Sequence, residues 1–255
     1  MLKTRVIPSL LIKDSGLVKT VRFKDPRYVG DPINAIKIFN EKEVDELVIL
    51  DIAASRRKLI DYALLARLNK EAFMPLGYGG GIKSVDEAKR ILGIGFEKII
   101  IDSAALDDPS LIERLASQCG SQSVVVCVDY RSNLFGKRVV FDYRKGSSTR
   151  KPMENWIKEC ESRGAGEVIL YSRDRDGTYS GYDLEAIAKL SGIVGIPTIA
   201  LGGARDIRDL LAAVDAGASA VAAGSMFVFY GPHRAVLITY PDKDKLKTEF
   251  SKQRK

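Results

Sequence analysis

Two glycine-containing turns in the second half of the chain have the composition of a phosphate-binding site. Gly202-Gly203-Ala204 and Ala223-Gly224-Ser225 each follow an apolar, β-rich run and precede a helical pattern. Glycine allows backbone N–H groups to approach an anion, and a helix N-terminus favours negative charge. One Gly-Gly pair is a weak signal, since sharp turns also need glycine, but two such turns on adjacent strands predict phosphate chemistry. The predicted phosphate-binding residues are Asp176, Gly177, Gly203, Gly224 and Ser225, the first two from the turn after the preceding strand.

The same pattern occurs once more, earlier in the chain. Residues 75–103 and 197–225 share their glycine and serine positions at a constant offset of 122 residues. The matching phosphate-binding candidates of the first copy are Gly81 and Ser103. Asp102 stands in this copy where the second copy has Gly224. Because a carboxylate repels a phosphate, we predict that the first pocket is weaker or altered.

The composition suggests a cytoplasmic protein with a small anionic ligand. Apolar and charged fractions of 45% and 29% are ordinary for a soluble globular protein. The net charge of +7 agrees with solvated lysines or with an anionic ligand. Without a nucleic-acid motif, a phosphorylated or nucleotide-linked small molecule is favoured over DNA or RNA. No apolar run has the length of a membrane span, and the N-terminus leads straight into a strand-like run instead of a secretory signal. The three cysteines lack disulfide or zinc spacing, so we expect a reducing cytoplasm, no metal and no cofactor.

Eight strand-helix alternations predict a (βα)8 TIM barrel, an α/β fold. Apolar, β-rich runs lie near 5–11, 46–51, 75–79, 98–102, 123–129, 167–172, 197–201 and 220–224. Helical patterns lie near 32–44, 58–70, 84–93, 109–118, 153–163, 183–191, 206–216 and 226–238. The internal repeat favours two duplicated (βα)4 halves in a single domain spanning 1–255, with a basic tail at 240–255. An open doubly wound sheet is the alternative, and it would not require matched halves.

Two long connections after predicted strands are rich in basic residues. They span 12–30, which includes Lys19, and 130–151. In a barrel both emerge on the C-terminal face, where active sites lie. We predict mobile lids over an anionic substrate, with Lys19 as a substrate-loop residue. The alternative is that both are ordinary solvated loops.

The sequence resembles the cyclase subunit of imidazole glycerol phosphate synthase, the HisF-like barrel of histidine biosynthesis. The resemblance covers residues 1 to about 230 and is most specific at Asp174-Arg175-Asp176-Gly177-Thr178. Further matches include Leu50-Asp51-Ile52, Gly79-Gly80-Gly81-Ile82, Ser180-Gly181-Tyr182-Asp183 and Gly202-Gly203-Ala204. It implies a partner glutaminase whose ammonia passes through the barrel core to a bis-phosphorylated substrate on the far face.

The resemblance also implies two carboxylates at the barrel mouth, one ending strand 1 and one ending strand 5. The strand 5 carboxylate is present as Asp129, the candidate catalytic residue, whereas the strand 1 position is Leu11. Leucine cannot transfer a proton. Asp102 replaces an expected asparagine, and Tyr171 replaces an expected threonine. These departures argue that the two-ended substrate of the family has been lost.

The opposite end of the barrel retains the residues of the family. Arg5, Glu46, Lys98 and Glu167 lie at the starts of strands 1, 2, 4 and 6. In the family, such a ring gates the ammonia channel; charged strand ends without a role are the alternative. The chain itself offers no glutaminase nucleophile, so we expect a separate HisH-like glutaminase at the N-terminal barrel face.

The C-terminal region resembles a bacterial paralogue of the cyclase subunit more than the histidine-pathway enzyme. The relevant stretch is Phe227-Val228-Phe229-Tyr230-Gly231-Pro232-His233-Arg234. That paralogue is associated with its own glutaminase and an N-acetyl-sugar amidotransferase, which convert acetamido to acetamidino groups on surface-polysaccharide sugars. Three hypotheses remain: an ammonia-channelling barrel for sugar amidation, an active histidine-pathway cyclase, and a non-catalytic scaffold that activates a glutaminase.

Overall fold

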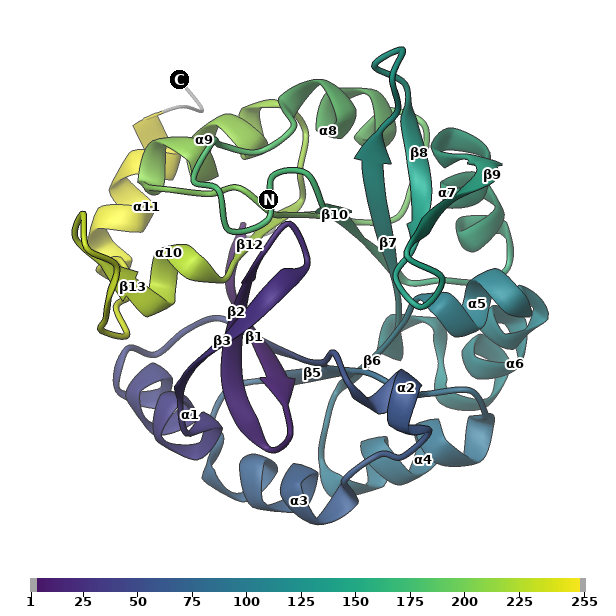
Figure 1. The fold of residues 1–255 in the computed structure, drawn as a ribbon, viewed down its shortest axis with the longest axis horizontal. Helices are drawn as coiled ribbons and strands as arrows, with labels where there is room; N and C mark the ends of the chain where they lie inside the picture. Colours follow the sequence, from purple (N-terminus) through teal and green to yellow (C-terminus); the bar gives the residue numbers. More distant parts are fainter. Residues whose placement is uncertain (1–3, 253–255) are drawn as a thin grey trace.

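Eight parallel strands close into a barrel within residues 4–252, the part of the chain that this computed structural model describes (Figure 1). The strands are β1 (Arg5–Lys13), β4 (Leu47–Asp51), β5 (Leu76–Gly79), β6 (Lys98–Ile101), β7 (Val124–Ser132), β10 (Glu167–Ser172), β11 (Thr198–Leu201) and β12 (Ala220–Ala223). Pairing of β12 with β1 and of β7 with β10 completes the ring. The predicted TIM barrel is confirmed, because an open sheet would leave two edge strands of the ring unpaired.

Each barrel strand is buried on both faces, as expected for parallel strands covered by helices. In β7, Val124 and Val126 face the helix layer, whereas Val125 and Cys127 belong to an apolar cluster inside the barrel. This alternation, with a period of two residues, decides which side chains reach the barrel axis. On each strand, every second side chain therefore points into the barrel, both at its N-terminal end (the floor) and at its C-terminal end (the mouth).

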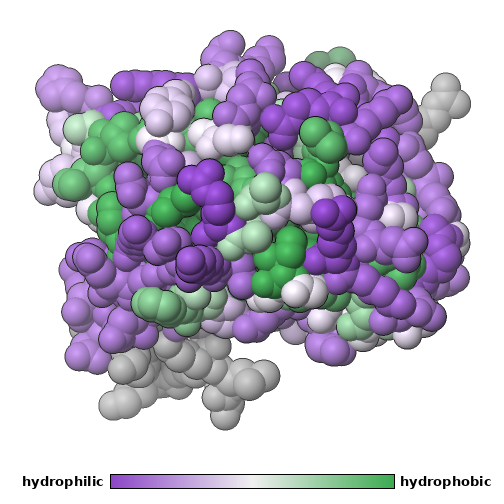
Figure 2. Space-filling model, turned by 90° about the horizontal axis from the view of Figure 1, so that it is seen from below, coloured by the Kyte–Doolittle hydropathy of each residue, from purple (hydrophilic) through white to green (hydrophobic). Residues whose placement is uncertain are grey.

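Within the described residues, seven helices of eight to ten residues follow the barrel strands and surround them. They are α1 (Pro32–Glu41), α3 (Tyr62–Glu71), α4 (Val85–Ile94), α6 (Ser110–Cys119), α7 (Met153–Ser162), α8 (Leu184–Ser191) and α9 (Ile207–Asp215), with short turns α2 (Ala54–Arg57), α5 (Ser103–Asp107) and η1 (Ser121–Ser123) between them. Ser84 and Glu87 form a reciprocal capping box that fixes the start of α4. The inner faces of the long helices bury leucine, isoleucine and alanine. The outer face of the molecule seen in Figure 2 is mostly hydrophilic, with separate small hydrophobic groups.

The helix predicted at 226–238 is wrong in length. Its first residues form α10 (Ser225–Val228), and the chain then turns into a small hairpin of β13 (Phe229–Tyr230) and β14 (Ala235–Val236). Gly231 adopts a positive φ of 71° and is followed by Pro232, which cannot donate a helical hydrogen bond. The helix therefore stops before the Gly-Pro pair, where the β-forming Phe229 and Tyr230 pair instead.

The two long connections are antiparallel hairpins rather than the predicted loops. The first contains β2 (Gly16–Val21) and β3 (Lys24–Gly30), and the second contains β8 (Arg138–Asp142) and β9 (Ser147–Pro152). β2 pairs with the end of β1, and β8 pairs with the end of β7, so both barrel strands continue beyond the barrel. Regular strand pairing therefore replaces the irregular loops that we expected, and the mobility of these segments stays a prediction.

The predicted basic tail contains a docked helix, α11 (Lys243–Lys252). Leu246 is only 6% exposed and joins the core, and α11 lies against α9. Residues 253–255 of the tail lie outside the described part of the chain. Among the described helices, none is long and apolar enough to cross a membrane.

Candidate functional site

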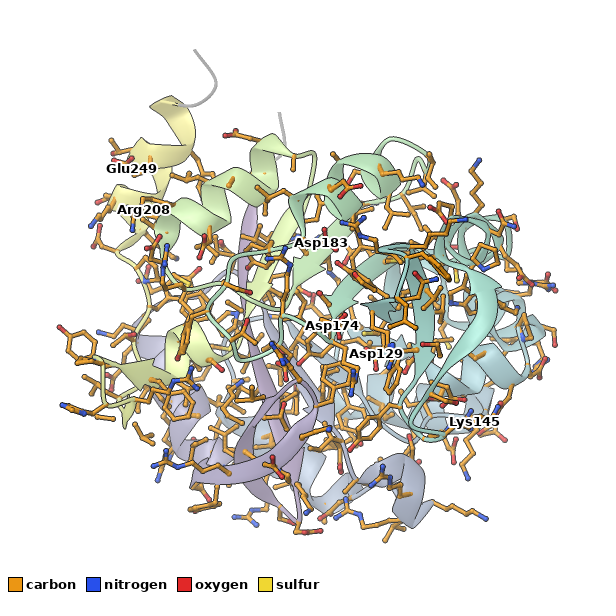
Figure 3. The ribbon with its side chains drawn as sticks, turned by 45° about the horizontal axis from the view of Figure 1, so that its top comes forward. Asp129, Lys145, Asp174, Asp183, Arg208 and Glu249 are labelled. Carbon is orange, nitrogen blue, oxygen red and sulfur yellow. The ribbon has the colours of Figure 1, made fainter. Side chains whose placement is uncertain are left out.

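The C-terminal ends of the barrel strands surround two cavities of very different size. The larger has a volume of about 300 Å³ and lies over the first half, with β4, β5, β6 and β7 at its base. The smaller, of about 20 Å³, lies over β11 and β12 in the second half. Leu11 and Tyr171 line both cavities and therefore stand between them. Asp129 lies near the centre of this mouth, whereas Lys145 on the second hairpin lies at its periphery (Figure 3).

The structure brings the predicted second-half residues together around the smaller cavity. Asp176, Gly177, Gly203, Gly224 and Ser225 all line it, as does Lys19 from the first hairpin. Gly203 has a φ of 106°, and a Cβ atom there would lie 2.2 Å from the carbonyl oxygen of Gly181. Close backbone packing therefore requires this glycine whether or not a phosphate binds.

Lys19 fills the space that a ligand would need in the second half. Its Nζ donates a 2.6 Å hydrogen bond to the carbonyl oxygen of Ser9 and lies over Gly224, 2.4 Å from where a Cβ would be. The side chain is 5% exposed. Burial lowers the pKa of Lys19 to about 8, and the nearby charge of Asp176 partly opposes this shift. Sequence reasoning found Lys19, but it did not show that the ammonium group lies inside the predicted phosphate cradle.

Asp176 holds the first hairpin against the barrel. Its carboxylate accepts hydrogen bonds from the hydroxyls of Thr20 (2.7 Å) and Tyr171 (2.9 Å) and from the backbone N–H of Phe23 (3.2 Å). Burial raises the pKa of Asp176, and these donors oppose the shift. Gly177 is packed against the same hairpin, since a Cβ there would lie 2.2 Å from the carbonyl oxygen of Thr20. The specific Asp-Gly-Thr turn therefore anchors the hairpin that carries Lys19.

The first-half candidates lie on the larger cavity, beside a carboxylate. Gly81 and Ser103 line this cavity, and the Ser103 hydroxyl donates a 3.2 Å hydrogen bond to Asp102 Oδ2. Asp102 Oδ1 is fully buried and has no hydrogen-bond partner among the described residues. Burial raises the pKa of Asp102 to about 7. The serine hydroxyl that was expected to meet phosphate is thus engaged by a carboxyl group.

Asp129 lies on the same cavity and is 7% exposed. The thiol of Cys127 donates to its Oδ1 over 3.6 Å. Burial, followed by the charge of Asp102, raises the pKa of Asp129 well above its usual range. A carboxyl group in this state can act as a general acid near neutral pH. Leu11, at the corresponding end of β1, adds only apolar surface to the same cavity.

The four charged residues predicted at the barrel floor form one connected ring. Arg5 donates to Glu46 and, over 2.8 Å, to Glu167, while Lys98 Nζ lies 2.9 Å from both carboxylates. Their side chains are between 4% and 26% exposed. Each cation thus contacts both anions, and the ring closes the barrel interior at its N-terminal end.

Three aromatic residues line the larger cavity, and the sequence singled out only Tyr171 among them. The rings of Phe23 and Tyr171 lie 4.6 Å apart and those of Phe23 and Tyr143 lie 6.0 Å apart, all edge to face. The guanidinium of Arg56 stacks on Tyr143 at 4.9 Å. The four residues come from four segments far apart in the chain, so no local spacing could have revealed the cluster. Among the described residues, no group of three or more His, Cys, Asp or Glu side chains could hold a metal ion.

Comparison with known proteins agrees with this architecture. The family described as "Histidine biosynthesis protein" matches residues 5–233. The chain is 51% identical over 248 residues to a Pseudomonas aeruginosa protein provisionally named imidazole glycerol phosphate synthase subunit hisF2, covering 96% of this chain and 99% of that protein. The chain belongs to the HisF-like cyclase-subunit family of imidazole glycerol phosphate synthase.

Other members of the family match over similar lengths. A Leptospira interrogans protein, provisionally named imidazole glycerol phosphate synthase subunit HisF, is 48% identical, with 96% of this chain and 97% of that protein covered. Imidazole glycerol phosphate synthase subunit HisF of Lactococcus lactis subsp. cremoris strain SK11 is 40% identical, with 91% and 90% covered. The chain therefore spans nearly the full length of these relatives.

Proposed function

We propose that this HisF-like chain is the ammonia-receiving barrel of a glutamine-dependent complex, with a separate HisH-like glutaminase bound at its N-terminal face. The observation that carries the proposal is a contrast between the two ends of the barrel. The floor ring of Arg5, Glu46, Lys98 and Glu167 is complete, whereas the mouth has Leu11 in place of the carboxylate expected on strand 1. Ammonia delivery needs the floor and the core, but not the paired carboxylates of the cyclase.

The interior above the floor suits a neutral molecule. Ile7, Val48, Ile100, Val125 and Ile169 belong to the buried apolar cluster inside the barrel. Moving a charge through such a layer is costly, whereas neutral ammonia meets a much lower barrier. The ring must therefore open for ammonia to enter while the layer above it excludes ammonium and other ions.

For the acceptor, we propose the acetamido group of a surface-polysaccharide sugar, converted to an acetamidino group together with an N-acetyl-sugar amidotransferase. The smaller cavity would bind a phosphorylated or nucleotide-linked part of the ligand after Lys19 leaves it. The division of the mouth by Leu11 and Tyr171 supports an acceptor other than an extended bis-phosphorylated one. The complex would work in the cytoplasm.

The histidine-pathway cyclase is the second candidate function, and the state of Asp129 favours it. This carboxyl group lies in the mouth with a raised pKa, which suits acid–base catalysis. A third candidate is a scaffold that only binds and activates the glutaminase, for which the floor ring would suffice.

A turnover assay with the histidine-pathway substrate and an ammonium salt separates these functions. We expect no rapid turnover by the native chain, and a gain of cyclase activity in Leu11→Asp, which restores the missing carboxylate. Rapid turnover by the native chain that is abolished by Asp129→Asn would overturn the proposal in favour of the cyclase.

The glutaminase partnership needs its own test. Tagged chain recovered from its source cells should retain glutamine-hydrolysing activity and an amidotransferase. In that complex, Lys98→Met should disturb the coupling between glutamine hydrolysis and ammonia use, because it breaks two contacts of the ring. Unchanged coupling in a folded Lys98→Met complex would contradict the gate. Coupled hydrolysis without an acceptor activity in the complex would favour the scaffold.

A further inference from the structure

We propose that the larger cavity binds a small nitrogen cation, an ammonium or amidinium group, between the carboxyl groups of Asp102 and Asp129. Asp102 directly follows β6, Asp129 lies within the neighbouring β7, and both line the cavity of about 300 Å³. The inference rests on the proposed function and deepens it, because it identifies what the cavity at the outlet of the ammonia path holds. It also replaces phosphate as the ligand expected beside Gly81 and Ser103.

Asp102 and Asp129 differ from the other aspartates around the cavity in forming no salt bridge among the described residues. The aspartates that line it are Asp51, Asp102, Asp107, Asp108 and Asp129. Three of these carboxylates form salt bridges: Asp51 with Arg57, Asp107 with Arg144, and Asp108 with Arg114. Among the described residues, none forms a salt bridge with Asp102 or Asp129. The cavity therefore keeps two carboxyl groups without a salt bridge, since Arg144, whose charge acts on Asp102, is already paired with Asp107 and Asp142.

The same two carboxyl groups have unused acceptor atoms. Asp102 Oδ1 is fully buried without a hydrogen-bond partner among the described residues, and Asp102 Oδ2 accepts from the Ser103 hydroxyl. Asp129 is 7% exposed, and its sole donor among those residues is the weakly donating thiol of Cys127. Buried polar atoms of this kind normally have partners. An ammonium or amidinium group supplies N–H donors and the missing positive charge in one ligand.

The walls of the cavity favour a cation over an anion as well. Phe23, Tyr143 and Tyr171 present aromatic surface to it, and Tyr143 already carries the guanidinium of Arg56 on its ring face. Aromatic faces attract cations through their quadrupole. A phosphate in the same place would meet two carboxyl groups without a cation of their own.

The protonation state of the pair agrees with an absent cation. Burial raises the pKa of Asp102 to about 7 and that of Asp129 well above its usual range, and the charge of Asp102 raises the pKa of Asp129 further. The other titratable groups that act on the pair are Cys127, Asp142, Arg144 and Asp176. Cys127 stays a neutral thiol because its pKa is raised well above its usual range. A bound cation would favour both carboxylates, so its affinity should fall as the pH drops below 7.

The test uses the chain alone, with backbone-amide NMR shifts followed during titration with ammonium chloride, acetamidinium chloride and sodium phosphate. At pH 8 we expect saturable shifts at Ser103 and Tyr130 with a cation, and about tenfold weaker binding at pH 6. Asp102→Asn should weaken cation binding by about tenfold or more, because a charge-assisted hydrogen bond is lost. Tighter binding of ammonium would identify the channelled species as the ligand, and tighter binding of acetamidinium would identify a product group.

A matched control is Asp108→Asn, which removes one charge from the rim of the same cavity. Because Asp108 is already paired with Arg114 at 2.8 Å, this variant should bind the cations like the native chain. Equal weakening in both variants, or no saturable cation binding by the native chain, would overturn the inference. If Asp102→Asn does not fold by circular dichroism, the pH dependence of the native chain decides. The glutaminase partnership is tested in the complex, so the two proposals can fail separately.

Discussion

The first half of the barrel mouth holds a cavity of about 300 Å³ with two carboxyl groups that form no salt bridge among the described residues, whereas the cavity over β11 and β12 in the second half measures about 20 Å³ and is lined by the buried Lys19. Both halves use the same scaffold, in which a barrel strand continues into an antiparallel hairpin and the next strands end in glycine turns. The duplicated backbone has therefore been preserved, while the buried charged side chains differ: two aspartates line the first cavity, whereas Lys19 accompanies Asp176 in the second. Ligand preference in this barrel is decided by a few side chains at strand ends.

The boundary between the halves explains why they can differ. Leu11 and Tyr171 line both cavities, and Tyr171 is fixed by Phe23 on one side and by Asp176 on the other. A ligand with two distant phosphates would have to cross this wall. The proposed cation of the first half and the proposed phosphate of the second half would each bind on one side of this wall.

The largest effect on stability should come from substitutions in the glycine turns, and the loss should be greater in the second half than in the first. Gly203→Ala places a Cβ 2.2 Å from the carbonyl oxygen of Gly181 at a φ of 106°, so backbone must move. We expect the free energy of unfolding to fall by about 4 kcal/mol, the upper range for single substitutions. Gly81→Ala is the matched control, since its closest contact is 3.1 Å from the small Ala54 side chain. It should cost about 1–2 kcal/mol, the penalty of a left-handed backbone.

Thermal or chemical unfolding of the two variants measures this difference. Equal losses would mean that the two turns are packed alike. Tighter backbone packing would then not explain the glycine at position 203, and a ligand would be the remaining explanation. A larger loss for Gly203→Ala would show that backbone packing alone requires glycine there.

Much of this arrangement follows from local sequence. The barrel can be predicted from the eight alternations between strand-like and helix-like hydrophobic patterns. The inward direction of Arg5, Lys98 and Asp129 can be predicted because side chains alternate between the two faces of a strand. The hairpins were missed because their basic residues disguised short β-forming runs such as Val139-Val140-Phe141. The position of the Lys19 ammonium group could not be predicted, since it depends on how a hairpin folds over strands far away in the chain.

The two halves should also respond to pH in opposite directions. The pKa of Lys19 is lowered to about 8 in the folded protein, so between pH 8 and about 10.4 the unfolded chain binds more protons. Stability should therefore gain about 3 kcal/mol from this group across that window. Asp102, whose pKa is raised to about 7, binds more protons when folded, so its contribution is lost as the pH rises from about 4 to 7.

Lys19→Met isolates the second-half contribution. Its unfolding free energy should lack the gain above pH 8, while the decrease between pH 4 and 7 should persist because Asp102 is untouched. Chemical denaturation at a series of pH values measures both slopes. A variant that keeps the alkaline gain would show that Lys19 titrates normally and does not lie in the cradle.

The smallest effect tests the wall between the halves. Tyr171→Phe removes the hydroxyl that donates 2.9 Å to Asp176 Oδ1 but keeps the ring against Phe23. We expect a loss of about 1 kcal/mol near neutral pH, since one hydrogen bond to a buried carboxylate disappears. That bond lowers the pKa of Asp176, so the loss should shrink at low pH, where Asp176 is protonated in both proteins.

Tyr182→Phe provides the comparison for this wall. The Tyr182 hydroxyl is also buried, but it donates over 2.8 Å to the uncharged carbonyl oxygen of Ala222. Its loss should cost a similar free energy that does not change between pH 4 and 7. If the two variants show the same pH dependence, the Tyr171 hydroxyl does not interact with an ionised Asp176. The wall formed by Leu11 and Tyr171 would then depend on aromatic packing alone, and Lys19 would be the only ionised group of the second-half cavity among the described residues that line it.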